Sequence, residues 1–381
     1  MIRLLYQADK YSNNLIGIKK IVYDPCKYLN EDYILFTNNL FDIRDDINII
    51  ITYSLELYEK YKSCKNILLF YNLIDAIEED AIVRIENSTL YFQYLPSSNN
   101  SQGLFFTKKC NHYCLMCSEP PSKDNFDYLI NENMKIVELM SKDTEVIGIT
   151  GGEPTLLGKD FFKIIKKIRE ELPNTQIRLL TNGRSYKNIE FCSELADIAK
   201  GFITSEIPVY STDYAKHDYI VQSRGAFFET IEGLYNCAIN GLNVEIRVVL
   251  TKQNYKDLSN IVSYVYKNMP FVNHIALMGL EYIGFAINNF DEIHINPLEY
   301  SNQLVEAVSL SQQYNIPVSI YNLPICLIDD SLIKYSRKSI SDWKNDFSDF
   351  CKDCCYRDIC CGMFSSTKPY FEKLLKPKYI G

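Results

Sequence analysis

The stretch LFFTKKCNHYCLMC at residues 104–117 joins a short apolar run to a loop that carries three cysteines. A short apolar run that gives way to polar residues is typical of a buried strand. The cysteines Cys110, Cys114 and Cys117 follow it with C-x3-C-x2-C spacing. This stretch predicts a metal-binding loop at the end of a strand, and the residues on either side of it indicate the fold.

Three thiolates on one loop fit a [4Fe–4S] cluster in which the fourth iron has no protein ligand. S-adenosylmethionine (SAM) can bind that iron through its amino and carboxylate groups. An electron from the cluster then cleaves SAM to a 5′-deoxyadenosyl radical, so that the cofactor supplies the reactivity and the protein positions it. The alternative is a Cys3His zinc site that recruits His112, although this histidine lies between two of the cysteines, too close to complete a relaxed tetrahedron easily.

From Leu104 onward, strand-like and helix-like segments alternate. Strands are expected at 104–109, 145–150, 176–181, 201–210, 244–250, 274–280 and 318–326. Helices are expected at 126–141, 160–171, 188–199, 226–240, 258–268 and 297–314. The strand centres are continuously apolar, which suits a parallel sheet covered on both faces. We predict an α/β fold, a partial (β/α)6 barrel with its chemistry at the C-terminal ends of the strands.

The ends of two of these strands carry residues that suit SAM binding. Gly151, Gly152, Glu153 and Pro154 follow the strand at 145–150. Glycines let a backbone approach a ligand closely, and the Glu153 carboxylate together with the backbone is a candidate for the SAM ammonium group. Thr181 and Asn182 begin a Thr-Asn-Gly sequence after the next strand. For both motifs the alternative is an ordinary turn.

Ser205, Arg247 and Met278 are the remaining candidates for contacts with SAM. Arg247 stands inside the apolar run at 244–250, where a bare charge is costly to bury and must be paired. A carboxylate such as that of SAM is a natural bidentate partner for it. A salt bridge to Glu206 or Glu153 is the alternative. Ser205 is a candidate for the carboxylate or ribose, and Met278 adjoins a glycine suited to adenine contact.

A second group of cysteines lies near the C-terminus, with C-x2-C-x5-C spacing. A closed cluster needs a fourth ligand, and Cys326 at the end of an expected strand is the best choice. We predict an auxiliary [4Fe–4S] cluster on Cys326, Cys351, Cys354 and Cys360. A structural zinc knuckle is the alternative. Cys355 and Cys361 stand beside two of these ligands, so the choice within each pair rests on spacing alone.

Composition narrows the class of protein. The 381 residues are 47% hydrophobic and 23% charged, with a formal net charge of −8. An acidic balance argues against broad nucleic-acid binding, which needs a basic surface. The first residues turn polar too soon for a signal peptide, and no apolar run reaches 18 residues. We therefore expect a cytoplasmic protein without a membrane segment, in which reduced cysteines bind metal rather than form disulfides.

Three regions are expected along the chain. Residues 1–102 should form a small β-rich or mixed domain, with strands at 33–36, 47–53, 66–74, 81–86 and 89–95 and a linker at 96–103. Residues 103–317 should form the partial barrel, and residues 318–381 the cysteine-rich extension. Our hypothesis is that the first domain recognises a substrate or a partner protein.

The ordered motifs resemble the radical SAM superfamily over residues 104–285. The segments at 110–121, 217–230, 244–253, 274–286, 319–326 and 337–345 are similar to the His-Xaa-Ser system radical SAM maturases of the HxsC type. The tail resembles the core of SPASM auxiliary-cluster domains, but Phe364 stands where a further cysteine would, so two auxiliary clusters are not expected. Met116 also departs from the aromatic residue that many superfamily members have before the third cysteine.

This resemblance implies an oxygen-sensitive enzyme that modifies a precursor peptide with His-Xaa-Ser repeats. It also implies a companion radical SAM protein of the same system and an electron donor such as flavodoxin or ferredoxin. One rival is a radical SAM enzyme that acts on a nucleoside or tRNA. The other is a non-catalytic adaptor stabilised by zinc.

Overall fold

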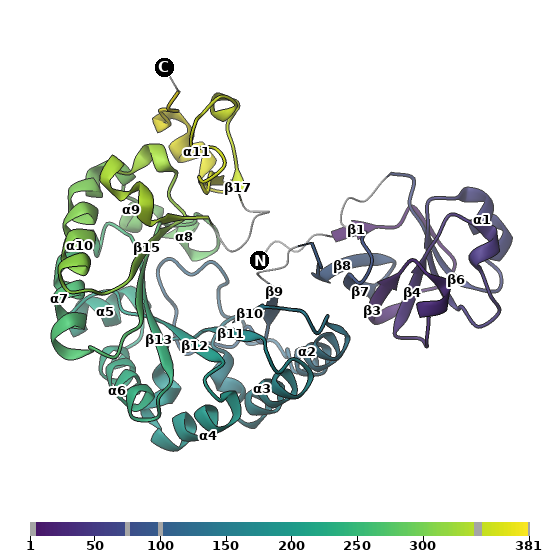
Figure 1. The fold of residues 1–381 in the computed structure, drawn as a ribbon, viewed down its shortest axis with the longest axis horizontal. Helices are drawn as coiled ribbons and strands as arrows, with labels where there is room; N and C mark the ends of the chain where they lie inside the picture. Colours follow the sequence, from purple (N-terminus) through teal and green to yellow (C-terminus); the bar gives the residue numbers. More distant parts are fainter. Residues whose placement is uncertain (1–4, 73–76, 98–101, 339–344, 380–381) are drawn as a thin grey trace. The chain divides into compact units, whose positions relative to one another are not determined.

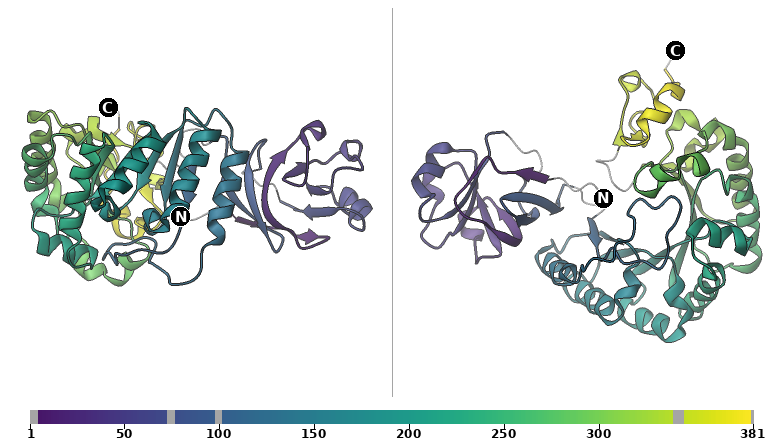
Figure 2. Two further views of the ribbon diagram at one scale, coloured as in Figure 1. Left: turned by 90° about the horizontal axis from the view of Figure 1, so that it is seen from below. Right: turned by 180° about the vertical axis from the view of Figure 1, so that it is seen from behind.

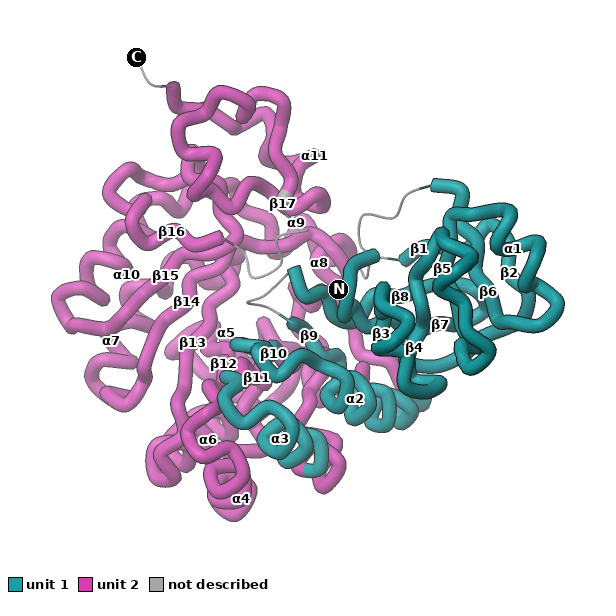
Figure 3. The backbone as a smooth tube through the Cα atoms, turned by 45° about the vertical axis from the view of Figure 1, so that its right-hand side comes forward, with its two compact units in different colours: residues 1–106, 125–148, 163–176 teal, residues 107–124, 149–162, 177–381 magenta. Residues whose placement is uncertain are grey.

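The computed structural model describes residues 5–72, 77–97, 102–338 and 345–379. The chain divides into two compact units, which Figure 3 shows in different colours. The first unit is made of Met1–Phe106, Asn125–Gly148 and Lys163–Gln176, and the second of Thr107–Asp124, Ile149–Phe162 and Ile177–Gly381. Residues 98–101 of the expected linker at 96–103 lie outside the described residues, as does the end of the strand expected at 66–74.

The N-terminal part of the first unit is a mixed sheet with the strand order β1-β8-β7-β3-β4-β5-β6-β2. Strands β3 to β6 run parallel, whereas β1, β2, β7 and β8 pair antiparallel with their neighbours. The elements are β1 (Leu5–Gln7), β2 (Lys10–Tyr11), β3 (Ile16–Val22), β4 (Tyr33–Phe36), β5 (Ile49–Thr52), α1 (Leu55–Tyr61), β6 (Asn66–Leu69), β7 (Ile82–Glu86) and β8 (Thr89–Tyr94). A mixed or β-rich domain is thus confirmed here.

This sheet has an apolar core on each face, because side chains alternate along a strand. Ile34, Ile49 and Ile51 belong to one buried cluster. Their neighbours Leu35 and Ile50 belong to another, which helix α1 covers with Leu57 and Tyr58. Such two-sided burial explains why the strands read as continuous apolar runs rather than as alternating ones.

The second sheet has the strand order β16-β15-β14-β13-β12-β11-β10-β9, and its pairs from β11 to β16 are all parallel. Its strands are β9 (Gln102–Phe105), β10 (Val146–Thr150), β11 (Gln176–Leu180), β12 (Ile203–Pro208), β13 (Asn243–Val249), β14 (His274–Met278), β15 (Val318–Tyr321) and β16 (Ser336–Arg337). The order follows the chain, as it does in a half-barrel built from successive βα units. The predicted partial barrel is confirmed.

Helices lie on the outer face of the curved sheet, as Figure 1 shows for α4, α6, α7 and α10 and Figure 2 shows from two further directions. The helices of this part are α2 (Tyr128–Leu139), α3 (Lys159–Glu171), α4 (Ile189–Ala199), α5 (Tyr214–Val221), α6 (Ala226–Ile239), α7 (Leu258–Asn268), α8 (Phe285–Asn288), α9 (Phe290–Ile293) and α10 (Ser301–Gln313). The tail adds β17 (Asn345–Asp346), β18 (Met363–Phe364) and α11 (Lys368–Phe371). None of the described helices is long and apolar enough to cross a membrane.

The two faces of the parallel sheet differ in chemistry. Toward the helices, Ile203 and Ile207 of β12 are fully buried, with aliphatic partners such as Ile177 and Ile246. On the inner face, every strand from β11 to β15 carries at least one charged or polar residue, and the pairing of the strands puts these residues on the same face. These inner-face residues are Arg178, Glu206, Glu245, Arg247, His274 and Ser319. An interior of this kind needs ligands or paired charges, because bare charges are costly to bury.

Several elements differ from the sequence prediction. The strand expected at 318–326 ends at Tyr321, and Cys326 lies in a 3-10 turn at Ile325–Leu327. Pro324 stands between strand and turn, where its missing N–H group does not interrupt a sheet. The helix expected at 297–314 is a 3-10 turn at Pro297–Tyr300 followed by α10. Strand β3 and helix α1 were not expected.

Candidate functional site

The cysteine loop at 110–117 is held by backbone hydrogen bonds to the end of α5. Tyr113 N donates to Val221 O at 3.0 Å, and Leu115 N donates to Ile220 O at 2.9 Å. Within the loop, Cys117 N donates to Cys114 O at 3.0 Å. The loop is therefore a defined turn that fixes where its three thiols stand.

Asn111, the residue after the first cysteine, anchors the loop from the other side. Asn182 Nδ2 donates to its side-chain oxygen at 2.6 Å, and Arg184 Nη1 donates to its carbonyl at 3.2 Å. Ser223 Oγ donates to the same carbonyl at 3.2 Å. Sequence reasoning chose Asn182 as a SAM contact and did not consider Arg184 or Asn111. The Thr-Asn-Gly-Arg sequence at 181–184 was the available signal.

The three thiols lie in a low-dielectric environment and within electrostatic reach of one another. Burial raises the pKa of Cys110 to about 12, and the nearby Glu153 and Cys117 add to that shift. Burial also raises the pKa of Cys114 and Cys117, and the two other thiols contribute to the shift of Cys114. Thiols of this kind are neutral when no metal is bound, and metal binding releases their protons. Three adjacent thiols with an apolar surround fit an iron–sulfur cluster.

His112 does not join the thiols around a single ion. It is 3% exposed, and burial lowers its pKa to about 3, so the imidazole is neutral. Its Nε2 atom has no hydrogen-bond partner among the described residues. Across the described residues, no group of three or more His, Cys, Asp or Glu side chains is arranged to hold one metal ion. A Cys3His zinc site needs the histidine beside all three thiols, whereas in a four-iron cube each cysteine binds a different iron.

The Gly151-Gly152 turn lies directly against the residues that lead into the cysteine loop. Gly152 N donates to Thr107 O at 2.6 Å, and Glu153 N donates to Lys109 O at 2.8 Å. A Cβ added at Gly151 would lie 2.4 Å from Thr107 O, and one added at Gly152 would lie 2.3 Å from Lys109 O. Only glycine permits this approach, so the turn and the cysteine loop form one structural block.

The Glu153 carboxylate is bound by the protein itself. It is 1% exposed, and Oε1 lies 3.1 Å from Thr155 N, 2.6 Å from Thr155 Oγ1 and 2.7 Å from Thr181 Oγ1. Asn182 N donates to Oε2 at 2.6 Å. Burial raises the pKa of Glu153, and these hydrogen bonds act in the opposite direction. The structure therefore places Glu153 and Thr181 in one network, with Pro154 beginning the 3-10 turn Pro154–Leu157 beside it.

The other SAM-contact candidates are not all brought together. Arg247 and Met278 lie on the inner face of the sheet. Met278 pairs with Val249, which is two residues after Arg247 on β13 and therefore on the same face. Ser205 points to the opposite face, where it is fully buried and lies 2.8 Å from the Tyr186 hydroxyl. The reason is the two-residue period of a strand, which places Ser205 opposite to Glu206.

Arg247 forms ion pairs with two carboxylates, as expected for an arginine inside an apolar strand. Nη2 lies 2.5 Å from Glu206 Oε2, and Nε lies 2.9 Å from Glu245 Oε1. The salt bridge to Glu206 was one of the alternatives, whereas Glu245 was missed. The signal for Glu245 was its place two residues before Arg247 in the same apolar strand.

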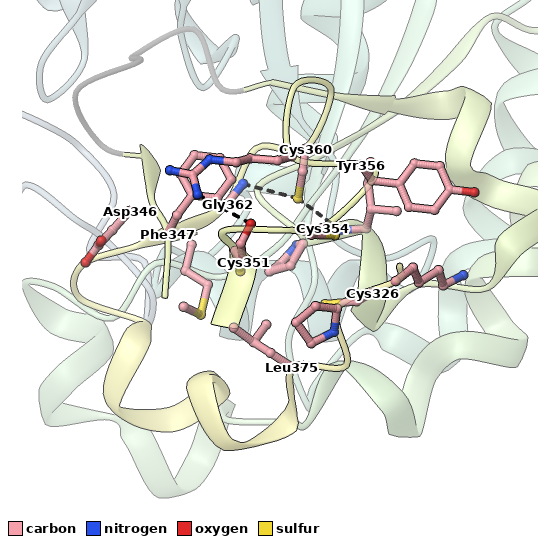
Figure 4. A pocket seen from close by; sticks show the side chains of 15 residues that line it. Cys326, Asp346, Phe347, Cys351, Cys354, Tyr356, Cys360, Gly362 and Leu375 are labelled. Atoms are coloured by element: carbon pink, nitrogen blue, oxygen red, sulfur yellow. Dashed lines mark hydrogen bonds between the residues drawn. The ribbon is translucent and has the colours of Figure 1, made fainter. Parts of the chain in front are cut away.

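The C-terminal cysteines surround a pocket, which Figure 4 shows from close by. Its lining includes all four predicted ligands and neither of the adjacent cysteines. The four are Cys326, Cys351, Cys354 and Cys360. Apolar side chains such as Met363 and Leu375 complete the wall.

The two doubled cysteines are directed elsewhere. Cys355 is exposed, and Cys361 is buried with its thiol donating to Gly362 O at 3.2 Å. Cys360 Sγ accepts from Ile325 N and Gly362 N, both at 3.4 Å. The neighbouring Cys361 thiol and these backbone N–H groups lower the pKa of Cys360 to about 6, although burial acts in the opposite direction. Cys360 is therefore the member of its pair prepared to act as a thiolate ligand.

A curved parallel half-barrel with a cysteine triplet and a glycine turn at its strand ends defines a class of α/β metalloenzyme. The sequence model of the radical SAM superfamily matches residues 104–265. The chain thus contains a radical SAM domain, and a [4Fe–4S] cluster and SAM are the cofactors of that domain.

Similarity to individual proteins is more distant. Fe-coproporphyrin III synthase of Methanosarcina barkeri is 27% identical over 206 residues, which are 53% of this chain and 49% of that protein. GTP 3′,8-cyclase of Campylobacter curvus is 24% identical over 264 residues, 64% of this chain and 73% of that protein. Streptococcus suis SuiB bound to SAM superposes with a TM-score of 0.48 at 16% identity, over 60% of this chain and 51% of that one. This chain spans about half the length of the first of these relatives.

Proposed function

We propose that this protein is a radical SAM maturase that modifies a precursor peptide. Cys110, Cys114 and Cys117 hold the catalytic cluster, and the backbone of Gly151 and Gly152 receives the amino end of SAM. The bound cofactors supply a 5′-deoxyadenosyl radical for hydrogen abstraction. The peptide substrate rests on the resemblance of residues 104–364 to the His-Xaa-Ser system maturases.

The observation that carries the radical SAM proposal is the contact between the glycine turn and the cysteine loop. Gly152 N donates to Thr107 O at 2.6 Å, and Thr107 stands three residues before Cys110 in the sequence. The glycine turn therefore lies next to the residues that lead into the cysteine loop. A ligand bound at the turn is consequently beside the metal site. A Cβ atom at either glycine would clash with the backbone of Thr107 or Lys109, so the close contact between the turn and the cysteine loop depends on both glycines.

The residues of this chain orient the ligand and exclude water. Glu153 ties Thr155, Thr181 and Asn182 together, and Asn182 in turn holds Asn111 of the cysteine loop. Behind the thiols, Leu115, Met116 and Tyr210 belong to one buried apolar cluster against which Cys114 packs. Such a surround keeps water away from a reactive radical. Arg247 supplies the cation for the SAM carboxylate.

The C-terminal pocket supports a second, auxiliary [4Fe–4S] cluster. Its four cysteines line one cavity, and a cluster closed by four thiolates needs no further ligand. Cys326 and Cys114 pack against the same apolar cluster, so both cysteine sites belong to the second unit's core. A zinc knuckle remains the alternative occupant, and iron and zinc analysis of the purified protein separates the two.

Residues 1–102 are proposed to recognise the precursor or the companion radical SAM protein. Deleting them should weaken precursor binding while SAM cleavage with dithionite continues. Unchanged precursor binding would remove this role. Reduction of the cluster in the cell is assigned to a flavodoxin or ferredoxin, which dithionite replaces in the assay.

A second candidate is modification of a nucleotide. The observation in its favour is that several matching relatives are GTP 3′,8-cyclases. The formal net charge of −8 favours a peptide over a nucleic acid, but it does not bear on a single nucleotide.

Anaerobic purification and product analysis test the proposal. We expect a brown protein with about eight irons per chain. It should form 5′-deoxyadenosine from SAM and dithionite, and the triple Cys→Ala variant at positions 110, 114 and 117 should not. Mass analysis of a co-expressed His-Xaa-Ser precursor, beside incubation with GTP, then selects the substrate. Colourless protein with stoichiometric zinc would leave only a non-catalytic adaptor.

A further inference from the structure

A closed ring of alternating charges lies on the inner face of the half-barrel. Arg178 Nε bonds to Glu206 Oε1, and Glu206 Oε2 lies 2.5 Å from Arg247 Nη2. Arg247 Nε lies 2.9 Å from Glu245 Oε1, and Glu245 Oε2 lies 2.8 Å from Arg178 Nη2. Each carboxylate thus bridges both guanidinium groups, and the ring spans β11, β12 and β13.

The ring is extended across two more strands on one side. His274 Nδ1 lies 2.9 Å from Glu245 Oε2, and His274 Nε2 lies 3.0 Å from Ser319 Oγ. Glu245 is therefore held by three partners, and its side chain has little freedom to turn. The carboxylates are almost fully buried, at 0% and 3% exposure of the Glu206 and Glu245 side chains.

Each arginine uses the same two nitrogens, Nε and Nη2, for these pairs. Within the described part of the chain, Nη1 of Arg247 makes no hydrogen bond. The Arg247 side chain is 13% exposed and that of Arg178 is 31% exposed. With two cations and two anions the ring is neutral, so Arg247 keeps an N–H edge for an anionic ligand without a surplus of negative charge beside it.

We infer that Arg178 is a positioning residue for SAM, acting through Arg247 rather than by contact with the ligand. This inference rests on the proposed function, in which Arg247 binds the SAM carboxylate. Without Arg178, Glu206 and Glu245 face a single cation, and the site carries a net negative charge. Arg247 is then drawn further toward the two carboxylates, and its N–H edge is no longer held in position for the SAM carboxylate.

The test measures equilibrium binding of SAM to the anaerobically purified, cluster-loaded enzyme, with 5′-methylthioadenosine as a second ligand because it lacks the amino-acid carboxylate. We expect Arg178→Ala to weaken SAM binding about 10-fold or more, the size of one charge-assisted hydrogen bond. Binding of 5′-methylthioadenosine should be unchanged. Arg178→Lys should recover part of the affinity, since it restores the charge but only one of the two bonds. Arg224→Ala, at an exposed arginine, is the matched control.

A double variant separates action through Arg247 from an independent effect. If Arg178 acts through Arg247, Arg178→Ala/Arg247→Ala binds SAM as weakly as Arg247→Ala alone. Additive losses, or equal weakening of both ligands by Arg178→Ala, would overturn the inference. If Arg247→Ala leaves SAM affinity unchanged, the Arg247 assignment fails and the inference with it. If the wild-type protein binds no SAM, the proposed function itself fails.

Discussion

Replacing Glu153 by Gln tests whether this carboxylate is mainly a support of the strand ends. Its two oxygens lie within hydrogen-bond distance of Thr155, Thr181 and the Asn182 N–H group, and the residue is 1% exposed. Glutamine has nearly the same shape but presents one NH2 group. In either orientation that group faces a donor, so at least one hydrogen bond is lost.

The magnitude follows from that loss. A hydrogen bond to a charged group is worth about 1.5–3 kcal/mol, and a buried donor left unpaired costs a similar amount. We therefore expect Glu153→Gln to lower the free energy of unfolding by about 3 kcal/mol. Thr181→Val removes a single hydroxyl from the same network and should cost about 1 kcal/mol. Glu194→Gln, at an exposed position on α4, should change the unfolding free energy by less than about 0.5 kcal/mol.

The assay is denaturant unfolding of the protein without SAM, followed by circular dichroism, together with SAM affinity by equilibrium binding. A carboxylate that mainly binds SAM would behave differently from one that supports the fold. Its loss would weaken SAM binding and leave the unfolding of the SAM-free protein within about 0.5 kcal/mol of wild type. That result would refute a supporting role for Glu153 and return this carboxylate to the set of SAM ligands.

Three further predictions rest on the same geometry. Gly152→Ala should abolish cluster retention, because its Cβ would stand 2.3 Å from Lys109 O, and iron analysis beside wild type checks this. Cys354→Ser should lose the iron of the auxiliary site, whereas Cys355→Ser should keep it, since Cys354 lines the pocket and Cys355 does not; equal iron in both variants contradicts the ligand choice. Although burial acts in the opposite direction, His274 and two arginines lower the pKa of Glu245 to about 2. The ionised Glu245 carboxylate therefore stabilises the folded protein fully above pH 4.5, the ordinary pKa of a glutamate, and this stabilisation is lost as the pH falls toward 2. Acid unfolding of the cluster-free protein should therefore be less steep in Glu245→Gln than in wild type over that range.

Much of the fold could be predicted because buried parallel strands leave a strong signal. The apolar runs at 176–181 and 244–250 correspond to β11 and β13, and the helix expected at 258–268 matches α7. Strand β3, with the sequence IGIKKIV, was missed because its glycine and lysines break the apolar run. Its place in the sheet comes from pairing with β7 and β4, which is information of long range that no local pattern contains.

The sequence predicted which residue types form the site better than it predicted which way their side chains point. Cysteine spacing alone favoured Cys354 and Cys360 over their neighbours, and these two line the C-terminal pocket. Ser205 was chosen because it stands near the end of a strand, but strand position does not decide which face a side chain takes. The register of β12 sends Ser205 toward Tyr186 and Glu206 toward the arginines.

Arg178 shows what a single strand cannot reveal. By itself, an arginine in the run QIRLL has no visible partner, and nothing distinguishes it from a surface residue of an edge strand. Its partners Glu206 and Glu245 lie 28 and 67 residues further along the chain. Charged residues recur in the apolar strands β11, β12 and β13, and parallel register brings them onto one face. A buried charge without a partner would be costly, so a charged residue in one of these strands indicates an opposite charge on a neighbouring strand. Reading the strands together, rather than one at a time, would have shown that Arg247 needed two carboxylates and that a second arginine was required to keep the site neutral.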